Sequence, residues 1–245
     1  MKKVFISGSI NIKNLHKAVI DELDSFIKRN CFIIIGDAYG IDQLVQKYLL
    51  SKKYYNVLIC TIYEYPRIIE SNEFDYEKIK YDLEEKSEKK KQSYKDKHMT
   101  EISDISLVIW DGKSTGSYRN IIDAIERNKE VKVFLDNKFM KLIDINVKAI
   151  TNIFYERHEY SLTEYLSEVV KKDKNCTIKS TKQMKEILKD RGVLTGNGVI
   201  DNKFIDSVTI DFIRGNRVYK YKKKLLDNYF SSYVNKNSIE NLSLF

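Results

Sequence analysis

The chain has 245 residues, enough for one large domain or for a large and a small one. Hydrophobic residues make up 42% of it and aromatic residues 12%, which supports a packed core and excludes global disorder. The formal net charge is +8, and more of the excess positive charge lies after residue 150. Such a charge suits an anionic partner, or it serves solubility alone. No apolar run approaches the roughly 20 residues that span a bilayer, so we predict a cytoplasmic protein.

Strand and helix patterns alternate through the first 135 residues. Apolar strands separated by amphipathic helices are typical of a parallel sheet covered on both faces, and right-handed crossovers make such a sheet doubly wound. We therefore predict the α/β class, with a Rossmann-like doubly wound parallel sheet in a nucleotide-binding domain over 1–145. The predicted strands are 4–7, 32–35, 56–63, 106–110 and 131–135, and the predicted helices are 14–29, a segment that begins near 41, and 118–127.

Residues 64–103 interrupt this alternation, and residues 84–97 within them are very highly charged. This charged segment is typical of a solvated helix with intrahelical ion pairs. The alternative is a lid that closes over an anionic ligand.

The remainder is predicted to form a connector over 146–176, with a helix at 162–170, and a small basic C-terminal α or α+β domain over 177–245. Residues 181–193 resemble the start of a small winged-helix or phage antirepressor-type domain. Basic residues interleaved with Tyr219 and Tyr221 can follow a nucleic-acid backbone, or they form a solvated face or a dimerisation element. These basic residues are Arg214, Arg217, Lys220, Lys222, Lys223 and Lys224.

Cysteine and histidine give no sign of a metal site. The three cysteines, Cys31, Cys60 and Cys176, are far apart and lack metal-ligand spacing, and the three histidines are equally scattered. We interpret the thiols as buried structural groups and predict neither a metal nor a cofactor.

Glycine-marked loops follow three of the predicted strands. Glycine lets the backbone approach a ligand closely, and the helix that follows presents free N–H groups and a positive dipole end to a phosphate. Hydroxyl groups and two cations add donors, and Asp37 or Asp42 can accept a bond from a ribose hydroxyl. The candidate ligand-binding residues are Gly8, Ser9, Gly36, Asp37, Gly40, Asp42, Asp111, Gly112, Lys113, Ser114, Gly116, Ser117 and Arg119.

These loops match neither of two well-known phosphate-binding patterns. Lys113 precedes the second glycine of its loop, so the loop is not a P-loop, and no Gly-x-Gly-x-x-Gly sequence follows the first strand. A typical NTPase or dehydrogenase is therefore disfavoured.

Three segments together resemble the SLOG superfamily: Phe-Ile-Ser-Gly-Ser near the start, Gly-Asp-Ala-Tyr-Gly-Ile-Asp at 36–42, and residues 95–117 with their Ile-Trp-Asp-Gly-Lys-Ser ending. The resemblance covers roughly 1–135. That superfamily includes the Lonely-guy phosphoribohydrolases, the DNA-processing protein A family and ligand-sensing domains of bacterial defence systems. It implies a Rossmann-like fold, a nucleotide or nucleotide-derived ligand and a homodimer or other homo-oligomer.

The sequence departs from the phosphoribohydrolase pattern at the positions that carry catalysis. Asn120 stands where that branch has its catalytic Glu, the third loop lacks the double glycine, and Lys95 or Lys97 represents the family arginine. Cleavage of an N-glycosidic bond needs a carboxylate, so the catalytic residue stays unknown. Four carboxylates remain as candidates: Asp37, Asp42, Asp111 and Glu101.

We therefore predict a protein that binds a nucleotide or a nucleotide-derived ligand, in a sensing or sequestering role that fits bacterial or phage conflict. One alternative is an N-glycoside hydrolase acting on nucleoside monophosphates. A second is a DNA-binding protein of the DNA-processing type. Tyr39 and Trp110 lie beside the loops and can stack on a base, although Trp110 equally suits packing under a helix.

Overall fold

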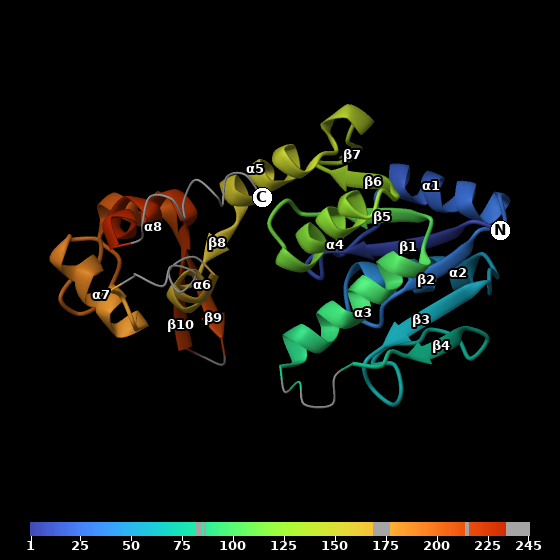
Figure 1. Ribbon diagram of the computed structural model, residues 1–245, viewed down its shortest axis with the longest axis horizontal. Helices are drawn as coiled ribbons and strands as arrows, with labels where there is room; N and C mark the ends of the chain where they lie inside the picture. Colours follow the sequence, from blue (N-terminus) through green and yellow to red (C-terminus); the bar gives the residue numbers. More distant parts are fainter. Residues whose placement is uncertain (82–84, 86, 169–176, 214–215, 234–245) are drawn as a thin grey trace. The chain divides into compact units, whose positions relative to one another are not determined.

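The structure is a computed structural model that describes residues 1–81, 85, 87–168, 177–213 and 216–233 (Figure 1). It divides the chain into two compact units, 1–150 and 151–245. Each unit has its own sheet and its own hydrophobic core. Among the described residues, no helix is both long and apolar enough to cross a membrane.

The first unit is built on a seven-stranded sheet in the order β4-β3-β2-β1-β5-β6-β7. Strands β1 to β6 run parallel, and only β7 is antiparallel to its neighbour β6. The predicted Rossmann-like α/β class is confirmed. The strands are β1 (Lys3–Gly8), β2 (Phe32–Ile35), β3 (Val57–Thr61), β4 (Asp75–Lys78), β5 (Ile105–Ile109), β6 (Glu130–Leu135) and β7 (Lys138–Phe139).

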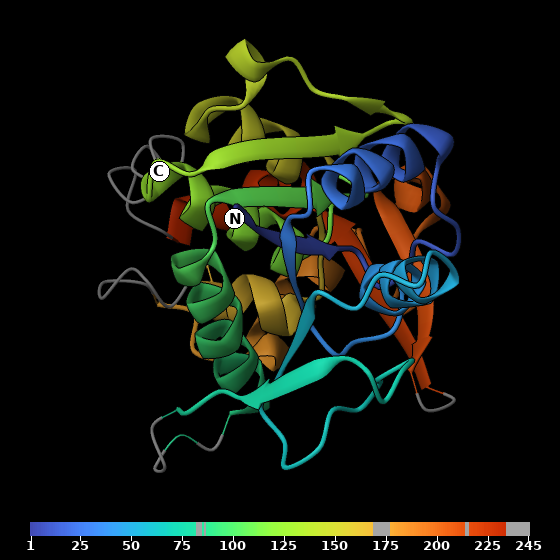
Figure 2. The same cartoon turned by 90° about the vertical axis from the view of Figure 1, so that its right-hand side faces the viewer.

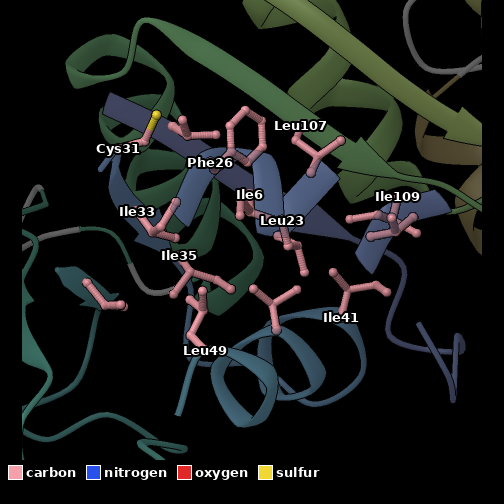
Figure 3. Close-up of a cluster of buried hydrophobic side chains, with 14 of the residues drawn as sticks. Ile6, Leu23, Phe26, Cys31, Ile33, Ile35, Ile41, Leu49, Leu107 and Ile109 are labelled. Atoms are coloured by element: carbon pink, nitrogen blue, oxygen red, sulfur yellow. The ribbon is translucent and has the colours of Figure 1, made fainter. Parts of the chain in front are cut away.

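Helices cover both faces of this sheet (Figure 2). Val4 and Ile6 of β1 pack with Leu23 and other apolar side chains of the first two helices, in the cluster that Figure 3 shows. The alternate residue Phe5 packs on the other face, with Met99. Burial on both faces explains why the strands are continuous apolar runs. The helices are α1 (Lys17–Lys28), α2 (Ile41–Ser51), α3 (Glu88–Ile102) and α4 (Thr115–Glu126).

The strand order reverses beside β1. The chain builds outward from β1 to β4 and then returns to place β5 on the other side of β1. The carboxyl ends of β1 and β5 lie so close that a Cβ on Gly8 would be 2.5 Å from the carbonyl oxygen of Ile109. In open parallel sheets, ligands bind outside the carboxyl ends of the strands at such a reversal.

Between β3 and β5, one strand was not predicted, and the predicted helix is partly buried. Strand β4 was not predicted, because its four residues are polar and exposed at the edge of the sheet. The charged segment does form a helix, α3, whose inner face buries Lys95, Met99 and Thr100. Residues 84 and 86 of that segment lie outside the described residues.

The second unit is an α+β unit with an antiparallel sheet in the order β8-β10-β9. Its core includes Tyr160, Leu162 and Tyr165, which belong to the stretch that the sequence analysis assigned to a connector. The elements are β8 (Glu159–Tyr160), α6 (Leu162–Glu168), α7 (Thr181–Asp190), β9 (Val208–Ile213), β10 (Asn216–Lys222) and α8 (Lys223–Phe230), while α5 (Val147–Arg157) spans the boundary between the units. Short 3-10 helices lie at Leu142–Asp144, Asn202–Ser207 and Ser231–Tyr233.

The described cysteines are buried in the first unit. Cys31 and Cys60 are free thiols inside its core, and burial raises the pKa of Cys60 to about 12. Neither thiol is therefore poised as a nucleophile. Cys176 lies outside the described residues.

Candidate ligand-binding site

A cavity of about 240 Å³ lies at the carboxyl ends of β1 and β2, beside the first turn of α4. All three glycine-marked loops contribute to its wall. Gly8 comes from the first loop, Gly36 from the second, and Gly116 and Ser117 from the third. The loops that the sequence analysis singled out therefore meet at one place in the fold.

The second loop has a structural role at the start of α2. Gly40 has a positive φ of 79°, and a Cβ there would lie 2.5 Å from the Cα of Ile10, so the position requires glycine. Asp42 accepts a hydrogen bond from the backbone N–H of Ala38 at 3.1 Å. Asp42 thus braces the loop that leads into α2.

Hydrogen bonds tie the third loop to the first. Asp111 Oδ1 accepts bonds from the N–H groups of Lys113 and Ser114, at 3.0 and 2.7 Å, around Gly112, whose φ is 80°. The N–H of Asp111 donates to Ser9 Oγ, which lies 2.6 Å from Ser114 Oγ. Ser9, Asp111 and Ser114 therefore hold the β1–β5 rim in shape.

Trp110 belongs to the core beneath this loop. Its side chain is buried, and Nε1 donates to the carbonyl oxygen of Ser114 at 3.2 Å. It packs under α4. The Tyr39 side chain, in contrast, is 69% exposed.

A buried charge network lies behind the cavity. The Asp37 carboxylate is fully buried and accepts bonds from Thr61 Oγ1 at 2.7 Å and from Lys95 Nζ at 3.1 Å. Arg67 donates to the same carboxylate from its backbone N–H, Nε and Nη2. Burial alone would raise the pKa of Asp37, but its bonds to Arg67, Lys95 and Thr61 outweigh burial and hold the pKa well below its usual range.

The two cations of this network also line the cavity. Lys95 is only 3% exposed and Arg67 is 38% exposed. Because both oxygens of Asp37 are already occupied by donors, we assign Asp37 to holding these cations in place. Of the two lysines that the family resemblance left open, Lys95 lines the cavity, whereas Lys97 lines a neighbouring groove between α3 and α4.

Several hydrogen-bond donors at the cavity lack a partner in the part of the chain that the structure describes. The amide groups of Gly116 and Ser117, and of Thr115 beside them in the first turn of α4, have no acceptor there. Ser7 Oγ and Gln92 Nε2 are buried without a hydrogen bond, and both residues line the cavity. Buried polar atoms are usually hydrogen-bonded, so these groups are available to donate to a polar partner inside the cavity.

Two carboxyl groups line the same cavity. Burial raises the pKa of Asp42 to about 7, against the charge of Lys95, and the nearby Asp96 and Asp37 raise it further. Burial likewise raises the pKa of Asp96 to about 6, with the charge of Asp37 acting in the same direction. Asp96, Arg67 and Ser7 were not predicted as site residues, because nothing local distinguishes them from surface or strand residues.

A groove of about 530 Å³ between α3 and α4 adjoins the cavity. The two spaces are neighbours, because Gln92, Asp96, Gly116 and Asn120 line both. The predicted contact Arg119 lines the outer groove. Among the described residues, no group of three or more His, Cys, Asp or Glu residues can hold a metal ion.

Comparisons with known proteins add little to this geometry. No family model matches the sequence, and no curated protein matches it. The structure is similar to DNA processing protein A from Helicobacter pylori, whose structure is described for its single-stranded DNA binding mode, with 19% identity and a TM-score of 0.42. The match covers 54% of this chain and 64% of that chain. A likeness at this level identifies neither a family nor a function.

The Asp37 network leads to a stability prediction. Asp37→Asn leaves the buried Lys95 without its counter-charge, so we expect a loss of about 3–5 kcal/mol in the free energy of unfolding, measured by urea denaturation. Asp21→Asn is the matched control, because it breaks an exposed pair with Lys17 and should cost under about 1 kcal/mol. Adding Lys95→Met to Asp37→Asn should recover part of the loss. Equal stability of Asp37→Asn and Asp21→Asn would contradict the network.

Proposed function

We propose that the first unit binds a nucleotide, with a phosphate group in the inner cavity and the rest of the molecule in the groove between α3 and α4. The observation that carries this proposal is the set of unpaired donors around one cavity. Free amides of Gly116 and Ser117, the hydroxyl of Ser7 and the amide of Gln92 surround a space that also has two cations.

The chemistry of these donors favours a phosphate over a neutral ligand. Amides in the first turn of a helix and the positive end of the helix dipole attract anions. Lys95 adds a buried positive charge, and Arg67 adds a guanidinium that suits phosphate oxygens. Both cations are already held by Asp37, so little side-chain entropy is lost when a ligand binds.

The groove suits the remainder of a nucleotide. Its walls offer the amide side chains of Gln92 and Asn120, which can both donate and accept, and the apolar surface of Ile122. The SLOG resemblance of residues 1–135 agrees with this class of ligand. Because Asn120 replaces the family's catalytic Glu, the role we propose is sensing or sequestering a nucleotide.

Ser7→Ala tests the proposal directly. Loss of one hydrogen bond to the phosphate should weaken nucleotide binding about fivefold or more, measured by isothermal titration calorimetry with a panel of nucleoside mono-, di- and triphosphates. Ser106→Ala is the matched control, because Ser106 is also buried and unpaired on the same face of the sheet but does not line the cavity. Equal effects of the two substitutions, or no binding by the unmodified protein, would refute the proposal.

The two cavity carboxyl groups favour a second candidate, hydrolysis of the N-glycosidic bond of a nucleoside monophosphate. Burial raises the pKa of both carboxyl groups, and the charge of Asp96 raises that of Asp42 further, so near pH 6 to 7 one of the pair can keep its proton while the other is ionised. An ionised and a protonated carboxyl in one site are the pair that acid–base catalysis uses.

This second candidate predicts release of free base from a nucleoside monophosphate, fastest between about pH 6 and pH 7. Asp96→Asn and Asp42→Asn should each slow release by about 100-fold or more while nucleotide binding persists. Glu101→Gln is the control, since Glu101 is exposed on α3 and does not line the cavity. Base release is measured by liquid chromatography. Nucleotide binding without any base release would refute hydrolysis and would be consistent with a binding role alone.

A further inference from the structure

A groove of about 700 Å³ lies within the second unit. Its walls come from α7, from β10, from the turn at 194–199 and from the start of α6. The described residues of the first unit take no part in it.

The groove has an unbalanced charge. Three cations line it, Lys185 and Lys189 of α7 and Arg217 of β10, and no carboxylate is among its lining residues. Lys189 lies 3.6 Å from Glu186, but Lys185 and Arg217 have no ion pair within the described part of the chain. Such a concentration of unneutralised positive charge attracts an anion.

Regular spacing brings these groups together. Thr181, Lys185 and Lys189 are four residues apart and share one face of α7. Arg217 and Tyr219 alternate along β10, so they share one face of the sheet. Tyr219 is half-buried and offers part of an aromatic ring beside the cations.

This groove differs from the basic stretch that the sequence analysis proposed as a nucleic-acid contact. Lys220 lies 2.9 Å from Asp211, and Lys223 lies 2.7 Å from Asp227, so both are neutralised within the unit. Arg214 lies outside the described residues. Of the described members of that stretch, Arg217 alone lines the groove.

We propose that this groove binds the phosphate backbone of a nucleic acid through Lys185, Lys189 and Arg217, with Tyr219 in contact with a base. The two lysines are about 6 Å apart along the axis of α7, so they can meet neighbouring phosphates of one strand. A single small anion would use only part of this row of charges. Aromatic rings beside a basic groove are typical of surfaces that stack nucleic-acid bases. The inference does not depend on the nucleotide cavity of the first unit.

The test uses the full chain and measures fluorescence anisotropy with a labelled oligothymidylate strand and a labelled DNA duplex. The triple variant Lys185→Gln, Lys189→Gln, Arg217→Gln should weaken binding about tenfold or more and flatten its dependence on salt. The matched control, Lys182→Gln, Lys203→Gln, Lys224→Gln, removes the same charge from exposed positions of the same unit outside the groove. Binding by this control should change less than about twofold.

The two probes distinguish a single strand from a duplex, and preference for either one supports the proposal. Ser7→Ala should leave this binding unchanged, which separates it from the nucleotide cavity. Equal losses in the two triple variants, no binding of either probe at low salt, or competition by a mononucleotide as strong as by the oligonucleotide would each overturn the inference. Circular dichroism confirms that both triple variants fold.

Discussion

The first unit depends on one buried carboxylate. Five hydrogen bonds from Thr61, Arg67 and Lys95 converge on Asp37. They join the end of β2 to the end of β3, to the segment after β3 and to the middle of α3. A buried ion pair of this kind adds little net stability, because desolvation offsets the attraction, but an unpaired charge there is very costly. The network therefore fixes where α3 lies, and with it where the two cations face the cavity.

Much of the fold could be predicted from the sequence, because the signal for it is local. Runs such as Phe32–Ile35, buried on both faces, are readable as strands, and glycines at their ends mark the loops that meet at the cavity. Strand β4 escaped prediction because an exposed polar edge strand has no apolar pattern. Arg67 and Asp96 escaped because their roles arise from contacts with residues distant in sequence.

The glycines show why sequence patterns only partly define a site. Gly8 and Gly40 are required by close contacts with Ile109 and Ile10, which are packing constraints within the protein. Around Gly116, by contrast, a Cβ would meet no atom within 4 Å, and the residue borders both the cavity and the groove. The three glycines cannot be told apart from the sequence. Only the atoms around each one show whether it is required for packing or leaves space for a ligand.

The central claim is that the free amides at the start of α4 bind a phosphate. The most direct test is a two-dimensional ¹H–¹⁵N NMR titration of the full chain with a nucleoside monophosphate. The account predicts that the amide resonances of Thr115, Gly116 and Ser117 show the largest chemical-shift changes. These changes should reach saturation at the same ligand concentration as the change in the ³¹P signal of the nucleotide. Saturating shifts centred on other residues, or no shift of these three amides, would contradict it.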